Sequence, residues 1–243
     1  MQASVIVAGI LLSNVALSHP DWPYTTDKIK PRYELKVNKR NEKSIEKIIS
    51  NLEHVPDQMQ QICNDHDGKV IIFDGNVADL KYMRYLKYQK PRGWHRGEWE
   101  DVIAAYNTLT KEVMIKQEYY KAQTSSANAE LHEYGHMVDY IFGEIISEKM
   151  NGMKRLSNAQ KFRKIHEKYA NKKVLGMFDV LEPYFKYLRD EFFAERFAEF
   201  YYSKRTRKML ERKFPEAYEY FKSLEESIDC SSSDYRNIPS PIQ

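Results

Sequence analysis

Two histidines four positions apart constrain this chain more than any other feature of its sequence. His132 and His136 enclose Glu133 in the pattern His-Glu-x-x-His. On a helix, a four-residue step places both imidazoles on one face, close enough to bind a single metal ion. Two imidazoles suit zinc, and Glu133 falls beside the open coordination position, where its carboxylate can act as a general base. The pattern is typical of a metallopeptidase and predicts one zinc ion per chain.

The residues around this motif favour a buried helix from about Asn128 to Glu148. Apolar side chains recur there at helical spacing, which predicts a helix with a buried face. They are Ala127, Ala129, Leu131, Met137, Val138, Ile141, Phe142 and Ile145. In such a place, two histidines without a metal would each need another polar partner. We therefore favour a metal site over a pair of structural histidines.

The third ligand has to come from another part of the chain. One class of metallopeptidases has glycine three residues and histidine six residues after the second histidine, but these positions hold Asp139 and Phe142 here. A carboxylate from another helix is therefore required. The apolar, helix-like segment from Asp190 to Phe200 offers Glu191 and Glu195.

Glu191 and Glu195 share one face of that second helix, because four residues separate them. In a site with two histidines and a glutamate, one carboxylate binds zinc. Another, one turn away, commonly accepts the N–H of a ligand histidine. Glu191 and Glu195 suit these two roles. The alternative is an exposed acidic face that pairs with Arg189 and Arg196.

The first 18 residues have the character of a secretory leader. Ala3 to Leu17 is almost entirely apolar, and Ala16 to Ser18 provides small residues for cleavage before His19. The apolar run is too short for a comfortable membrane span. Because Met1 and Gln2 bring no positive charge, a retained anchor and a misplaced start codon are the alternatives. We expect a secreted, extracellular protein without a membrane span once the leader is removed.

Composition places the whole chain among ordinary globular proteins. Its hydrophobic fraction is 42%, its charged fraction 30% and its net charge +3, so bulk charge indicates no nucleic-acid partner. We expect a monomer with a single domain over residues 19–230, lobes at about 19–150 and 151–230, and a flexible tail over 231–243. The two cysteines, Cys63 and Cys230, either form a disulfide or stay as separate buried thiols.

Hydrophobic periodicity predicts a mixture of strands and helices. Strands are expected at Tyr33–Val37 and Val70–Phe73, and a hairpin at Val102–Tyr106 and Lys111–Gln117. Helices are expected from Ser44, as N-cap, to about Asp65 with a bend at Pro56, and over Asn158–Tyr169, Asp190–Lys204 and Pro215–Ser227. The hairpin precedes the motif helix and would offer an edge to an extended substrate.

The segment from Lys81 to Arg96 alternates cations with aromatic rings. Such a mixture can bind single-stranded nucleic acid. No recognised nucleic-acid motif accompanies it, so we expect no nucleic-acid partner. We favour a solvated helix that leads into a loop at Pro91–Trp94, near the active-site cleft.

The stretches Leu131 to Asp139 and Glu191 to Phe197 together resemble the catalytic domain of anthrax lethal factor. They resemble more closely the small secreted Pro-Pro endopeptidases related to it. The likeness includes Pro91–Trp94 and spans roughly Lys81 to Leu224. It implies a zincin-like α+β metallopeptidase. The N-terminal lobe would carry a small mixed sheet and the motif helix, and the C-terminal lobe would be helical.

The resemblance also implies roles for individual residues. Glu191 is by this match the third zinc ligand, and Tyr184, seven residues before it, stabilises the oxyanion. Arg92 and Trp94 would border the substrate cleft. Asp190 replaces a glutamate that the Pro-Pro enzymes tend to have, and it too would lie near the substrate.

These observations predict a secreted zinc metalloendopeptidase acting on protein or peptide substrates. Pro-Pro bonds in proline-rich extracellular or cell-surface proteins are the suggested targets. Two alternatives stay open. One is a non-catalytic secreted binding or adhesion module with a structural metal site, and the other is a toxin-type metalloprotease that acts on host proteins.

Overall fold

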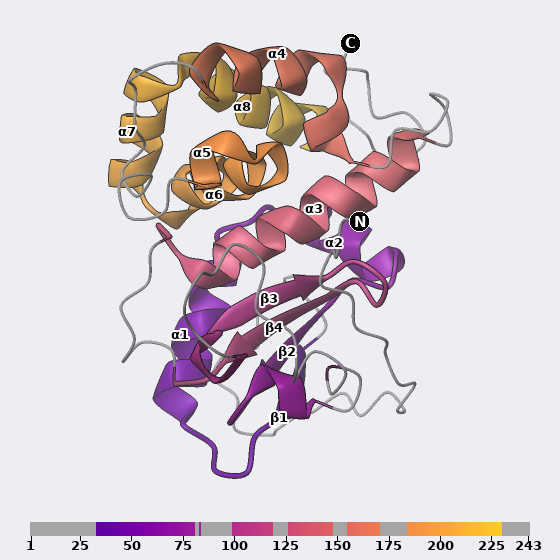
Figure 1. The fold of residues 1–243 in the computed structure, drawn as a ribbon, viewed down its shortest axis with the longest axis vertical. Helices are drawn as coiled ribbons and strands as arrows, with labels where there is room; N and C mark the ends of the chain where they lie inside the picture. The colour runs from indigo at the N-terminus through magenta and orange to yellow at the C-terminus, as the bar shows by residue number, and fades with distance from the viewer. Residues whose placement is uncertain are drawn as a thin grey trace.

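The computed structural model describes residues 33–80, 83, 99–118, 126–147, 155–170 and 184–229. One long helix, α3 (Ala129–Ser147), lies between a small sheet and a group of C-terminal helices, as Figure 1 shows. The predicted α+β class, with a small mixed sheet and a helical C-terminal part, is confirmed. The histidine motif therefore lies at the junction of the two layers.

The sheet has four strands in the order β1-β2-β4-β3. Their bounds are Tyr33–Lys36 for β1, Lys69–Phe73 for β2, Ala104–Asn107 for β3 and Glu112–Lys116 for β4. β1, β2 and β4 run parallel, and β3 pairs antiparallel with β4, from Ala104 opposite Ile115 to Asn107 opposite Glu112. The predicted hairpin is thus confirmed, and β3 forms an edge of the sheet.

Both faces of the central strands are covered, which explains why β2 reads as an unbroken apolar run. Val70 and Ile72 belong to the main core, together with apolar side chains of α3. Ile71 and Phe73 point to the other face and pack in a smaller cluster with Trp99. The sheet is therefore a rigid support beneath α3.

The first predicted helix is two helices, α1 (Glu42–Leu52) and α2 (Asp57–Asp65), separated at Pro56. The prediction that Ser44 caps it is wrong. Asn41 has the non-helical backbone of an N-cap, and its side chain accepts a hydrogen bond from the backbone N–H of Ser44 at 3.3 Å. Asparagine satisfies a free N–H of the first turn as well as serine does, so the N-cap and the helix start lie three residues earlier than predicted.

The C-terminal helices are α4 (Gln160–Ala170), α5 (Tyr184–Tyr187), α6 (Arg189–Tyr202), α7 (Lys204–Lys213) and α8 (Pro215–Asp229). Three short 3-10 segments complete the described elements: η1 (Val77–Asp79), η3 (Trp99–Asp101) and η5 (Leu156–Asn158). The predicted helix over Asp190–Lys204 ends earlier, because Ser203 adopts an extended backbone and forms a capping box with Thr206.

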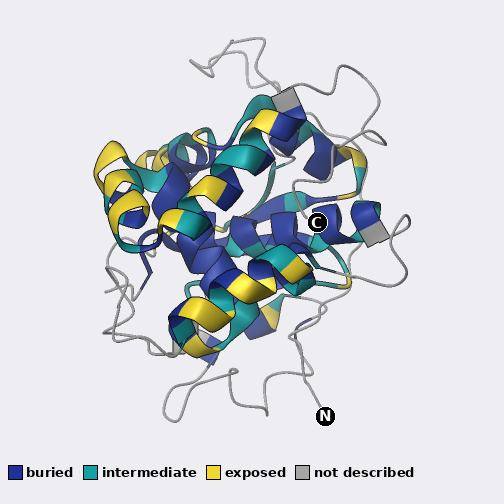
Figure 2. Ribbon diagram, turned by 90° about the horizontal axis from the view of Figure 1, so that it is seen from above, coloured by how far each residue is buried: buried dark blue, intermediate teal, exposed yellow. Residues whose placement is uncertain are grey.

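α6 is the central helix of this layer, and it is buried from Glu191 to Tyr201. Aromatic rings surround it and pack in tilted and edge-to-face arrangements, which favours a rigid core. The contacts include Phe162 with Phe193, Phe193 with Phe221, and Phe197 with Tyr201. Figure 2 shows the consequence, with buried inner faces and exposed outer faces on the surrounding helices.

Several predictions fall outside the described residues: the leader at 1–18, the loop at Pro91–Trp94, the lobe boundary near residue 151, Cys230 and the tail. Cys63 is buried and carries no disulfide in the structure. Cys230 lies outside the described residues, so both predicted alternatives, a disulfide and two separate thiols, stay predictions. Within the described parts of the chain, no helix combines the length and the apolar character needed to cross a bilayer.

Candidate metal centre

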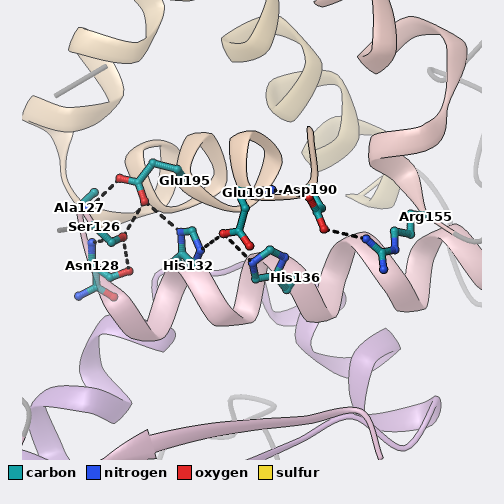
Figure 3. Close-up of polar contacts among 9 residues, drawn as sticks. All are labelled: Ser126, Ala127, Asn128, His132, His136, Arg155, Asp190, Glu191 and Glu195. Carbon is teal, nitrogen blue, oxygen red and sulfur yellow. Dashed lines mark hydrogen bonds and ion pairs between the residues drawn. The ribbon is translucent and has the colours of Figure 1, made fainter. Parts of the chain in front are cut away.

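His132, His136 and Glu191 each bring one possible ligand atom to a common point, and these atoms lie within 4.8 Å of one another. Nε2 of His132 is 3.1 Å from Oε2 of Glu191, and Nε2 of His136 is 3.5 Å from the same oxygen (Figure 3). A tetrahedral zinc ion, with bonds of about 2.0 to 2.2 Å, keeps neighbouring ligand atoms roughly 3.4 Å apart. The three side chains therefore fit a single divalent ion such as zinc.

The glycine between the two histidines allows α3 and α6 to approach each other. A Cβ atom added to Gly135 would lie 3.1 Å from Cα of Ala194 and 3.1 Å from Cβ of Phe197. Such contacts are tighter than nine in ten of those that real Cβ atoms make, so a larger residue would require α6 to give way by a few tenths of an ångström. Gly135 opposite Ala194 thus sets the separation at which Glu191 reaches the imidazoles.

Glu195 holds His132 from the side opposite to the common point. Its carboxylate is fully buried and lies 3.0 Å from Nδ1 of His132. The same carboxylate accepts hydrogen bonds from the Ser126 hydroxyl at 2.7 Å and from the Ala127 backbone N–H at 2.8 Å. With Nδ1 donating to Glu195, the lone pair of Nε2 is directed toward the common point. This geometry supports the predicted role of Glu195 in orienting a ligand histidine.

The loop before α3 completes this end of the site. Oδ1 of Asn128 accepts a hydrogen bond from the Leu131 backbone N–H at 2.9 Å and so caps the helix. The Ser126 hydroxyl, which donates its proton to Glu195, accepts a hydrogen bond from the Asn128 backbone N–H at 3.3 Å. We did not predict roles for Ser126 and Asn128. An asparagine just before an apolar helical run is an N-cap signal, so the role of Asn128 could have been predicted. Ser126 carries no comparable signal.

The charges of the site favour a bound cation. Burial alone would raise the pKa of Glu191, but His136 and His132 outweigh it and hold that pKa well below its usual range. Burial alone would lower the pKa of His132, but hydrogen bonds with Glu191 and Glu195 raise it to about 10. An ionised carboxylate beside two imidazoles is a suitable environment for a divalent ion that replaces the protons.

The site is partly open to solvent. The side chains of His136 and Glu191 keep 15% and 12% exposure. Glu133 lies on the same turn of α3 as the histidines and is half-buried. In the described residues, the group that could hold a metal has three members, whereas a structural zinc site normally has four protein ligands. Burial raises the pKa of Glu133, and His132 and His136 partly offset this rise.

The alternative of an exposed acidic face on α6 is excluded by the burial of this helix. Arg189 donates to the Asn158 side chain at 2.5 Å, and the fully buried Arg196 pairs with Glu199 at 3.1 Å. Glu191 and Glu195 are buried and lie 3.1 and 3.0 Å from the ring nitrogens of His132. The two glutamates face the histidines instead.

The remaining predicted site residues are placed only in part. Asp190 precedes Glu191, and its carboxylate accepts a hydrogen bond from Arg155 at 2.9 Å. Tyr184 is the first residue of α5, and its side chain is outside the described part of the structure. Arg92 and Trp94 are also outside the described residues, so their roles stay predictions.

Comparisons with known proteins agree with this geometry. The family model described as anthrax toxin lethal factor, N- and C-terminal domain, matches residues 29–224. A Pro-Pro endopeptidase of Clostridioides difficile is 25% identical over 178 residues, which cover 73% of this chain and 74% of that protein. One from Paenibacillus alvei is 27% identical over 175 residues, covering 71% and 73%. The solved structure of a Pro-Pro endopeptidase from Paenibacillus alvei is similar in fold, with a TM-score of 0.64 at 24% identity over 79% of this chain and 96% of that one.

The substitution Gly135→Ala tests whether helix separation controls the metal site. The added methyl group should force α6 away from α3, lower the stability of the metal-free protein by about 1 to 3 kcal/mol and weaken zinc binding. Chemical denaturation without metal and titration with zinc would measure the two effects. An unchanged zinc affinity would show that Glu191 reaches the histidines without this close approach.

The substitution Glu195→Gln tests the orientation of His132. Removing the charged acceptor of the Nδ1 proton should weaken zinc affinity by roughly 10- to 100-fold. Glu199→Gln is the matched control, because Glu199 lies one turn further along α6 and pairs with Arg196, not with a histidine. Competition with a chromophoric chelator gives the affinities. Equal losses in both variants would remove the specific role of Glu195.

Proposed function

The chain belongs to the anthrax toxin lethal factor family, and on this basis we propose that it is a zinc metallopeptidase. The observation that carries the proposal is the convergence of His132, His136 and Glu191, with Glu133 on the same helical turn as the histidines. Three protein ligands and partial exposure leave room for water and substrate. They favour an enzyme over a binding module with a structural metal.

The protein's own groups would perform proton transfer and orientation in this reaction. Zinc, when bound, supplies Lewis-acid chemistry that lowers the pKa of water toward about 7 and polarises a peptide carbonyl. Glu133 would take a proton from the attacking water and pass it to the leaving nitrogen, a role that its burial-raised pKa suits. The Tyr184 hydroxyl would donate to the oxyanion.

The edge strand β3 gives the substrate a place beside the base. The pKa of Glu133 is lowered in part by a hydrogen bond from the backbone of Tyr106, which lies in β3. An extended peptide that pairs with the free edge of β3 would therefore pass close to Glu133 and to the metal ligands. This arrangement supports an endopeptidase that binds its substrate as an added strand.

We further propose that the enzyme cleaves bonds between two prolines. Two of its relatives are Pro-Pro endopeptidases. Proline has a fixed backbone angle and no N–H, so a site must recognise it by shape and by aromatic surfaces. Arg92 and Trp94 are our candidates for that surface. Because residues 1–18 have the character of a secretory leader, we propose extracellular or cell-surface proteins as substrates.

The substitution Glu133→Gln should abolish nearly all peptide cleavage and leave zinc affinity almost unchanged, because an amide cannot accept the proton. Glu144→Gln is the control on the same helix, since Glu144 pairs with Lys111 at 2.8 Å and not with the histidines. Steady-state cleavage and zinc content would be measured for both. A Glu133→Gln enzyme that still turns over would exclude Glu133 as the base.

Cleavage of peptides that differ only at the central pair tests the substrate proposal. Substrates with Pro-Pro, Pro-Ala and Ala-Pro should be cut at Pro-Pro alone. Chelation of the metal should stop the reaction, and added zinc should restore it. Zinc-dependent cleavage without a proline requirement would keep the peptidase and refute the Pro-Pro specificity.

The substitution Tyr184→Phe should reduce turnover by about 10²- to 10³-fold with zinc content intact, because it removes one donor to the oxyanion. Tyr187→Phe in the same short helix is the control, as Tyr187 is 62% exposed. Mass-spectrometric peptide assays would compare the two. If both variants keep normal turnover, another group must stabilise the oxyanion.

A further inference from the structure

A short segment that provides no metal ligand joins the two helices that provide all three. It comprises Arg155 and η5, and we call these residues, 155 to 158, the bracket. One side of the bracket contacts the C-terminal half of α3, beyond His136. The other side contacts the N-terminus of α6, at Glu191. Figure 3 shows its Arg155 reaching across to Asp190, next to the site.

The bracket is fixed to α3 by buried polar contacts. The carboxylate of Asp139, three residues after His136 and 1% exposed, accepts two hydrogen bonds from Ser157. The backbone N–H donates at 2.6 Å and the hydroxyl at 2.7 Å. A carboxylate held by two donors in a buried position defines the register of the two segments closely.

The backbone of the bracket also lies directly on α3. A Cβ atom on Gly143 would stand 2.3 Å from Cα of Arg155, so only glycine permits this approach. The Arg155 guanidinium lies 4.6 Å from the centre of the Tyr140 ring and donates to the Tyr140 hydroxyl at 3.3 Å. Arg155 is therefore held on α3 before it reaches the other helix.

On α6 the bracket holds the residues that immediately precede Glu191. Nη1 of Arg155 donates to Oδ2 of Asp190 at 2.9 Å, and Oδ1 of Asp190 accepts from the Glu191 backbone N–H at 3.2 Å. Arg189 donates to the side chain of Asn158, the last residue of the bracket, at 2.5 Å. Both residues before the third ligand are thus tied to the bracket.

The first turn of α6 needs such support, because Leu188 at its N-cap has no side chain that caps it. A first turn without an N-cap side chain frays more readily. Glu191 lies in that turn, where the carboxylate of Asp190 accepts its backbone N–H. Metal coordination tolerates errors of only about 0.2 Å in ligand position. A shift of α6 along α3 by one residue would move the carboxylate by about 1.5 Å.

We propose that the bracket positions Glu191 against His132 and His136, with Arg155 as its principal positioning residue. The bracket ties the third ligand's turn to the helix that carries the other two. Gly135 sets how far apart the helices lie, and the bracket sets where Glu191 stands along α3. This inference rests on the proposed zinc site. It gives Asp190 the role of linking Arg155 to the backbone of Glu191.

Zinc affinity of Arg155 variants, measured by competition with a chromophoric chelator, tests the proposal. Arg155→Ala should weaken zinc binding by about 10-fold or more, because it removes a contact that orients a ligand. Arg155→Lys keeps one charge–charge contact and should recover part of the loss. Gly143→Ala, which displaces the bracket without changing its side chains, should weaken zinc as well.

A control and a double-mutant cycle separate positioning from general destabilisation. Arg207→Ala removes a partly exposed ion pair with Glu225 and a stacking contact with Phe200 at the C-terminal end of α6, far along that helix from Glu191. It should therefore leave zinc affinity unchanged. If Arg155 acts through Asp190, then Arg155→Ala and Asp190→Ala together should weaken zinc no more than either alone. Additive losses would contradict that route.

The outcomes are distinguishable from failure of the proposed function. If Arg155→Ala keeps wild-type zinc affinity, with or without a lower melting temperature, the proposed positioning role of the bracket is refuted and the metal site stands. If Arg155→Ala does not fold, Arg155→Lys and Gly143→Ala decide by the same criterion. A wild-type protein that binds no zinc would instead overturn the proposed function.

Discussion

The close packing of α3 against α6 is the contact on which the candidate site depends. Gly135 opposite Ala194 lets the helices approach until a glutamate of one reaches two histidines of the other. The remaining layers hold these two helices in place. The sheet lies on one side of α3 and the C-terminal helices on the other, as Figure 1 shows. Aromatic rings packed around α6 hold that helix in place. The candidate ligands therefore lie on two packed core helices and not on a separate loop.

The two helices are joined at both ends of the ligand group. The loop that leads into α3 is tied to Glu195 through Ser126 and Ala127. The segment that follows α3 is tied to Asp190 through Arg155. Each tie lies within a turn of a ligand, so the polar contacts fix orientation where apolar packing alone would permit sliding. Because the polar contacts fix the orientation of the two helices, charged groups are buried close to the core.

Features that follow a regular spacing of residues could be predicted from the sequence. Contacts between residues far apart in the chain could not. Helical spacing identified α3, and the four-residue steps between His132 and His136 and between Glu191 and Glu195 identified the groups that face each other. The break at Ser203 was missed because its capping box is a local polar contact inside an otherwise helical pattern. The role of Arg155 could not be predicted. Its partners lie on two other helices, and no spacing links them to position 155.

The central claim is that one divalent ion binds between the histidine pair and the third ligand. Anomalous diffraction at the zinc absorption edge, from crystals of the zinc-loaded protein, tests it most directly. We expect a single strong peak within bonding distance of Nε2 of His132, Nε2 of His136 and the carboxylate of Glu191, with no fourth protein ligand. A peak elsewhere, or a zinc ion bound without Glu191, would contradict it.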